Sequence, residues 1–289
     1  MSTETRVHDV RFTRFEGELD GEGAAIIALA RWSALRSMGA RRSWKVKLIP
    51  IALTLIAFAP AIVVLGLRAL FSTRVQINIE TALPYRDYAG MIGLVITLFA
   101  AVTTPELLCP DRRDRVLTLY FSTALTRGQY VFGKVLAAIV PLLLLTLVPM
   151  WFLYAGNVLF AVHPVGYVQD HAADALRITV SGIALAAWFG LVGLAVASLT
   201  GRRAFAVGGY LLLLVAPTVV FGLISEAIGG DPGWPQLGQL SVLPINFAAS
   251  IWPDSDVPNS TGAWALMYLL VVGVAVLTLL RRYSARAAA

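Results

Sequence analysis

The sequence predicts an all-α integral membrane protein with six transmembrane helices, an N-terminal interfacial helix and both termini in the cytoplasm. Hydrophobic residues, counted without glycine, make up 58% of the 289 residues, and charged residues make up 14%. A soluble domain has about 45–50% apolar residues even with glycine counted, and about 25% charged residues. Six apolar runs are long enough to cross the hydrocarbon core, which takes ~20 residues of helix. The basic residues gather on one side of these runs, as the positive-inside rule requires.

Residues 1–47 are predicted to be a cytoplasmic leader followed by an amphipathic connecting helix. A signal peptide places its apolar core earlier and ends in a small-residue cleavage site, so we expect this leader to be retained. Between Ala24 and Lys47, apolar and basic residues recur at helical spacing and tryptophans suit the headgroup layer, which favours a helix in the inner interface. A plain juxtamembrane tether is the alternative. The candidate interfacial residues are Ile27, Arg31, Trp32, Leu35, Met38 and Trp44.

One membrane domain, residues 48–289, is predicted to hold the six spans. Backbone groups in lipid must hydrogen-bond to one another, so each apolar run is predicted to be a helix. The predicted spans are Leu48–Leu67, Tyr88–Leu108, a span that starts near Tyr130, Ile178–Leu199, Ala204–Ile228 and Ala263–Leu280.

The third apolar run is longer than one crossing needs. As a single helix, the stretch from Tyr130 to Val162 would reach ~50 Å, and no polar turn divides it. We therefore predict one crossing, kinked near Pro141 or Pro149 because proline removes a helical hydrogen bond. The remainder, from about Tyr154, is predicted to lie at or beyond the outer interface.

The distribution of lysine and arginine predicts the orientation. Nineteen of the 23 lie in the leader, between spans two and three, at the start of span three, between spans four and five, or after span six. Four lie on the opposite side, and segment 229–261 has none. This excess predicts that the basic side is cytoplasmic. It also accounts for the net charge of +6 without a nucleic-acid partner.

Signals for enzyme chemistry are weak. The stretch from Gly128 to Lys134 matches part of a P-loop, but Val135 replaces the Ser or Thr that would hold Mg²⁺. No strand precedes the stretch, so we predict no nucleotide binding by this chain. The single cysteine, Cys109, is predicted to have a packing role, and the scattered histidines His8, His163 and His171 are interpreted as solvated loop residues. No cofactor or metal site is predicted.

The membrane spans also lack an obvious ion-coupling site. Glu106, Lys134 and Glu226 lie near span ends, whereas an ion-driven carrier usually has a titratable or coordinating site near the midplane. If the protein moves a substrate, the energy is therefore expected to come from a partner. The lack of a charged site deep in the spans favours lipid-like or amphipathic cargo.

Segment 109–128, between spans two and three, is the candidate docking surface. Its charges can orient a partner, and its apolar side chains can fill a partner's groove. A solvated loop is the alternative reading. The candidate residues are Asp111, Arg112, Arg113, Asp114 and Arg127 among the charges and Leu117, Tyr120 and Phe121 as anchors.

The run from Leu119 to Arg127, followed by Tyr130 and Gly133-Lys134, resembles the signature of type-2 ABC-transporter permeases, which are exporter-like membrane subunits. The resemblance implies that 109–128 contains a coupling helix and that segment 229–261, chiefly Trp234–Trp252, forms short re-entrant helices on the outer side. The family often has Pro where Ala124 stands, so the end of the coupling helix could differ in shape.

The same resemblance implies an export permease in a bacterial plasma membrane, with a separate ATP-binding subunit and a second permease subunit, identical or related. The stretch 1–47 is shorter than a typical domain of ~100–200 residues, so any ATPase is expected on another polypeptide. This chain is accordingly predicted not to be an enzyme. A membrane scaffold or assembly factor without transport, or a membrane-embedded lipid-modifying enzyme, are the alternatives.

Overall fold

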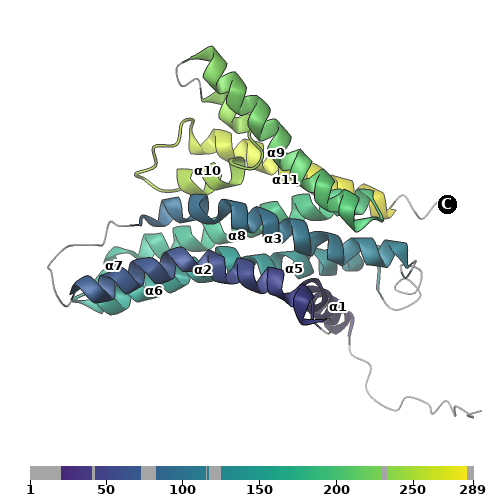
Figure 1. Ribbon diagram of the computed structural model, residues 1–289, viewed down its shortest axis with the longest axis horizontal. Coiled ribbons are helices and arrows are strands. Elements are labelled where there is room, and N and C mark those ends of the chain that lie inside the picture. The colour runs from purple at the N-terminus through teal and green to yellow at the C-terminus, as the bar shows by residue number, and fades with distance from the viewer. Residues whose placement is uncertain are drawn as a thin grey trace, which may run out of the picture.

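A computed structural model of the chain describes residues 21–40, 43–72, 83–114, 116, 125–229 and 233–284. Within these ranges every regular element is helical, and six helices are long and apolar enough to cross a membrane. Figure 1 shows them arranged as an elongated bundle, with the C-terminal end of α9 tilted away from the rest. The spans are α2 (Trp44–Ser72), α3 (Tyr85–Arg113), α5 with α6 (Arg127–Thr146 and Val148–Phe160), α8 (Ala172–Leu199), α9 (Arg203–Ile228) and α11 (Thr261–Ser284).

The six predicted spans are confirmed as helices, and they extend past the apolar runs. The clearest case is α3, which was expected to end at Leu108 and continues to Arg113. A helix can continue past the end of its apolar run, because its backbone hydrogen bonds do not depend on lipid. Charged side chains are tolerated on the part of the helix that lies outside the hydrocarbon core. The extra turn of α3 carries Asp111, and this extension therefore decides where the candidate site lies.

The long third run forms one candidate membrane span with a break, and the break lies near one of the two predicted prolines. α5 ends at Thr146 and α6 begins at Val148, so the break lies at Leu147, two residues before Pro149. Proline has no N–H to donate, and its ring crowds the carbonyl four residues earlier, here that of Leu145. α5 continues through Pro141 without a break. The short helix α7 (Pro164–Asp170), which precedes α8, was not predicted from the sequence.

α3 and α8 form the centre of the bundle. Most of both helices is buried, whereas less than a quarter of the apolar stretch of each of α2, α9 and α11 is buried. A side chain at Gly193 of α8 would place its Cβ 2.5 Å from Oγ1 of Thr104 on α3. The two central helices therefore approach closely because a small residue stands at their contact, as is common between membrane helices.

The described part of the segment between α9 and α11 contains two short helices, and their re-entry into the membrane from the outer side stays a prediction. They are the 3₁₀ helix η2 (Trp234–Gly238) and α10 (Leu243–Ser250). α10 packs against α3, α8 and α11, and its residue Ala248 accepts a hydrogen bond from Ser181 of α8 at 3.4 Å. α10 is thus part of the folded core of the bundle.

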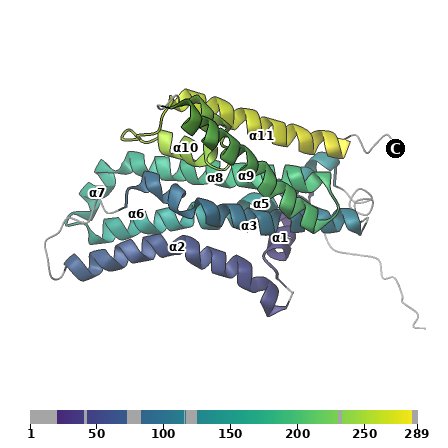
Figure 2. The same cartoon turned by 45° about the horizontal axis from the view of Figure 1, so that its top comes forward.

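The N-terminal helix α1 (Glu22–Ser37) packs mainly on α5 and also on α3. The two views show it lying across the ends of these helices (Figures 1 and 2). The stretch Ala24–Lys47, which was predicted to be one helix, instead contains most of α1, a turn at residues 38–40 and the start of α2. Gly39 forms the turn with φ of 82°, a left-handed conformation that glycine adopts without a steric penalty. We call this part of the molecule the α1 end of the bundle; the C-terminal end of α11 lies at the same end (Figure 1).

Candidate functional site

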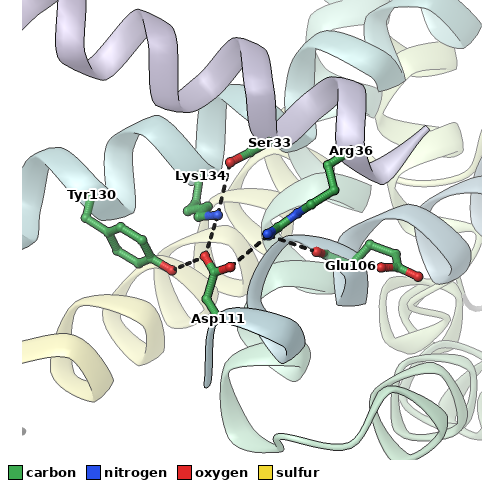
Figure 3. A network of polar contacts seen from close by, with 6 residues as sticks. All are labelled: Ser33, Arg36, Glu106, Asp111, Tyr130 and Lys134. Atoms are coloured by element: carbon green, nitrogen blue, oxygen red, sulfur yellow. Dashed lines mark hydrogen bonds and ion pairs between the residues drawn. The ribbon is translucent and has the colours of Figure 1, made fainter. Parts of the chain in front are cut away.

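The α1 end of the bundle contains a buried polar network centred on Asp111, which is 1% exposed. Oδ2 of Asp111 lies 2.6 Å from Nζ of Lys134 and accepts a hydrogen bond from the Tyr130 hydroxyl at 2.9 Å. Oδ1 accepts from Nη2 of Arg36 at 2.8 Å. Figure 3 shows the carboxylate between the cations of α1 and α5. One side chain of α3 therefore joins three helices.

Close packing of α1 on α5 brings this network together. Gly133 of α5 faces Leu29 of α1, and a Cβ at Gly133 would lie 2.9 Å from Cδ2 of that leucine. The next residue, Lys134, donates a hydrogen bond to Ser33 of α1 at 3.0 Å. The Gly-Lys pair that resembles a P-loop therefore lies inside a membrane helix. Its glycine admits α1, and its lysine pairs with Asp111.

The electrostatics of the network depend on each charge having its partner. Lys134 is 1% exposed, and removal of a charge from water is costly unless an opposite charge and hydrogen bonds replace the lost hydration. Arg36 keeps 35% of its side chain exposed and also donates to the backbone carbonyl of Glu106 at 3.3 Å. The Lys134–Asp111 pair is thus the fully buried part of the network, and Arg36 connects this pair to the protein surface.

A second set of contacts joins the same end of α3 to α8 and α9. Glu106 is 4% exposed and pairs with Arg203 of α9. Arg112 donates to the carbonyl of Ser198 near the end of α8. The last turns of α3 therefore connect α1 and α5 on one side with α8 and α9 on the other.

Beside these contacts lies a polar hollow of about 830 Å³. It is lined by the end of α3 and the turn between α8 and α9, including Arg113, Asp114 and Arg202. Arg113 and Asp114 are exposed. This hollow is partly lined by the start of the predicted docking segment.

The predicted docking residues fall into three groups. Asp111 is buried inside the bundle, and Arg112 is half-buried, whereas Arg113 and Asp114 are at the surface. Arg127 is half-buried at the start of α5. The predicted anchors Leu117, Tyr120 and Phe121 lie outside the described residues, and the docking role of the segment stays a prediction.

The end of the segment is held firmly where α5 begins. Thr126 caps the helix: its hydroxyl accepts from the backbone of Gln129 at 3.3 Å, and the Gln129 side chain accepts from the Thr126 backbone at 2.8 Å. This reciprocal pair is a capping box. Gln129 also donates to Glu22 of α1 at 2.8 Å, so the cap and α1 are connected.

The predicted interfacial residues of α1 lie mostly on the face that points away from the network, except Trp32, which lines a hollow beside Ser33 and Arg36. Arg31, Trp32, Trp44 and Ile27 are exposed, and Leu35 and Met38 are half-buried. The opposite face of α1 is buried through Leu29, Ser33, Ala34 and Ser37. The buried face of α1 therefore packs on protein, and its place in the headgroup layer stays a prediction.

Sequence reasoning missed Ser33, Arg36, Tyr130 and Lys134 as members of one site. Lys134 was the residue that could have pointed to this site, because it is a charged residue inside an apolar run. Such a residue almost always pairs with another polar group. Asp111, the first acidic residue after Glu106 along the chain, was the candidate partner. Its neighbours in α1 could not be inferred, since α1 is distant in sequence.

The described residues hold no group of three or more His, Cys, Asp or Glu side chains that could bind a metal ion. Cys109 is buried, and its thiol lies 3.7 Å from the carbonyl of Thr200. No family model matches the chain, and no curated protein matches it.

Proposed function

We propose that the chain is the permease subunit of an ABC exporter, which forms the translocation pathway and works with a separate ATP-binding subunit. The support comes from the six helices able to cross a membrane and from the resemblance of residues 119–134 to type-2 permeases. In this proposal the α1 end of the bundle is cytoplasmic, because most of the Lys and Arg residues that the structure describes lie there. The membrane is the bacterial plasma membrane.

The observation that carries the proposal is the position of Asp111. It lies just before segment 115–124, while Tyr130 and Lys134, which contact it, lie just after that segment. A partner that pushes on the segment would therefore push on α3 and α5 together. Arg36 extends the connection to α1. Packed elements with charge pairs can carry such a displacement, whereas an unsupported loop would absorb it.

In this proposal, segment 109–128 docks on the ATP-binding subunit. Arg113 and Asp114 are exposed next to the polar hollow and supply orientation. Leu117, Tyr120 and Phe121 supply the apolar anchors, and a small interface concentrates its binding energy in such residues. Two permease subunits would complete the pathway, and the exposed apolar faces of α2, α9 and α11 are available for lipid and for the second subunit.

The experiment isolates the tagged chain from its native membrane and identifies the proteins that remain bound. The proposal predicts an ATP-binding subunit whose ATPase activity depends on the permease. Changing Leu117, Tyr120 and Phe121 together to alanine should abolish this association, while Arg113→Ala should weaken it little because a rim charge contributes under about 1 kcal/mol.

Two outcomes contradict the proposal. The first is recovery of the chain without any ATP-binding subunit, which favours a scaffold or assembly role. The second is full assembly and activity of the triple-alanine variant, which makes segment 109–128 a solvated loop. A membrane fraction that contains the variant at the normal level is the control for insertion.

A further inference from the structure

A second feature of the α1 end is an apolar groove between α1 and α5, on the side of α1 that faces away from Asp111. Its volume is about 490 Å³. The lining consists of one stripe from each helix: Ile27, Ala30, Arg31, Ala34, Leu35 and Met38 from α1, and Leu136, Val140, Pro141 and Leu144 from α5.

The shape of the groove follows from helix geometry. Leu136, Val140 and Leu144 recur every four residues, so they form one stripe that runs ~12 Å along α5. α1 crosses this helix, so the groove begins under α1 and continues along the membrane span. Ile27 is 66% exposed, and Val140 is 57% exposed. The groove is therefore open toward the lipid side and has the elongated, apolar form that suits a hydrocarbon chain.

The charge beside the groove is positive. Arg31 is the one charged residue among the described residues that line it. In the sequence, segment 24–47 carries six Lys or Arg and no Asp or Glu, of which Arg36 is turned to Asp111 on the other face of α1. Lys47 packs against the turn at Gly39, close to the end of the groove at Met38. Clusters of this kind next to a membrane helix attract anionic lipid headgroups.

We propose that this groove binds an anionic phospholipid of the inner leaflet, with one acyl chain along the α5 stripe and the phosphate at Arg31. The acyl chain covers the apolar stripe of α5, and the phosphate meets Arg31, the one charged residue in the described lining. A bound lipid would also brace α1 from the side opposite Asp111. This proposal requires that the chain lies in a membrane, but it does not require the transport function proposed above. The lipid proposal and the transport proposal can therefore fail independently of each other.

The test is native mass spectrometry of the full chain in detergent during titration with phosphatidylglycerol or phosphatidylethanolamine. Phosphatidylglycerol should be retained at lower concentration. Arg31→Ala should weaken its binding about five-fold, the effect of about one basic contact with an anionic headgroup. Ala30→Phe should reduce the binding of both lipids by filling the groove.

Matched controls separate this site from general lipid contact. Arg282→Ala removes another exposed arginine at the α1 end, and Ala155→Phe enlarges an exposed alanine of α6; both should leave binding unchanged. Equal retention of the two lipids, or unchanged binding in Arg31→Ala, would overturn the proposal. So would a groove occupied by a second copy, seen as a dimer that Ala30→Phe dissociates without loss of lipid. Because Arg31 is exposed, we expect the Arg31→Ala variant to fold. It therefore still tests the proposal if the Ala30→Phe variant does not fold.

Discussion

Replacement of Asp111 by alanine should destabilise the protein more than replacement of both Asp111 and Lys134 by neutral residues. The single change leaves the Lys134 ammonium, with 2% of its side chain exposed, without the carboxylate that lies 2.6 Å away. Breaking a buried pair in this way costs about 3–5 kcal/mol. The Tyr130 hydroxyl loses an acceptor as well, which contributes about 1 kcal/mol.

The double variant Asp111→Ala with Lys134→Met removes both charges. Arg36 is partly exposed, so it can turn toward water. We therefore expect the double variant to lose no more stability than either single variant, which corresponds to a coupling of about 3 kcal/mol between the two residues.

The assay is unfolding in mixed micelles with increasing sodium dodecyl sulfate, followed by loss of helical circular dichroism. Arg113→Ala, a neighbouring change on the surface, is the control and should alter stability by less than about 0.5 kcal/mol. If the double variant loses the sum of the two single losses, Asp111 and Lys134 act independently and the buried network does not hold the helices together.

Three further predictions concern topology, packing and nucleotide binding. Cysteines at Ser255 and Ser284, in a chain without its own cysteine, should label from opposite sides of the membrane; same-side labelling contradicts the six-span topology. Gly193→Ala should lower stability by about 1–3 kcal/mol because its Cβ collides with α3, whereas Gly273→Ala, in open space on α11, should not. The purified chain should not bind ATP, and saturable binding abolished by Lys134→Ala would refute the assignment of that lysine to the buried pair.

The spans could be predicted because they depend on local composition. A run of ~20 apolar residues must be helical in lipid whatever it packs against. The break at Leu147 was predicted to within a few residues because proline acts on its own helix. Helix α7 was missed because its seven residues mix polar and apolar side chains without a clear period.

The polar network could not be predicted in full because its pairs are distant in sequence. Arg36 and Asp111 are 75 residues apart, and Ser33 and Lys134 are 101 residues apart. Only the packing of α1 across α3 and α5 brings them together, and hydrophobic periodicity carries no information about which helices become neighbours. The sequence showed a lysine in an apolar run and an acidic residue at a span end, but not that they meet.

The most direct test of the account measures whether α1, α3 and α5 move as one unit when the ATP-binding partner acts. Spin labels at the exposed positions Trp32 of α1 and Phe132 of α5 report on distances inside the unit. A second pair, at Phe132 and Leu280 of α11, reports on motion between the unit and the rest of the bundle. In the assembled complex, the account predicts that ATP changes the second distance and leaves the first unchanged. A change in the first distance with none in the second would show that the Asp111 network does not carry the motion, and would contradict the account.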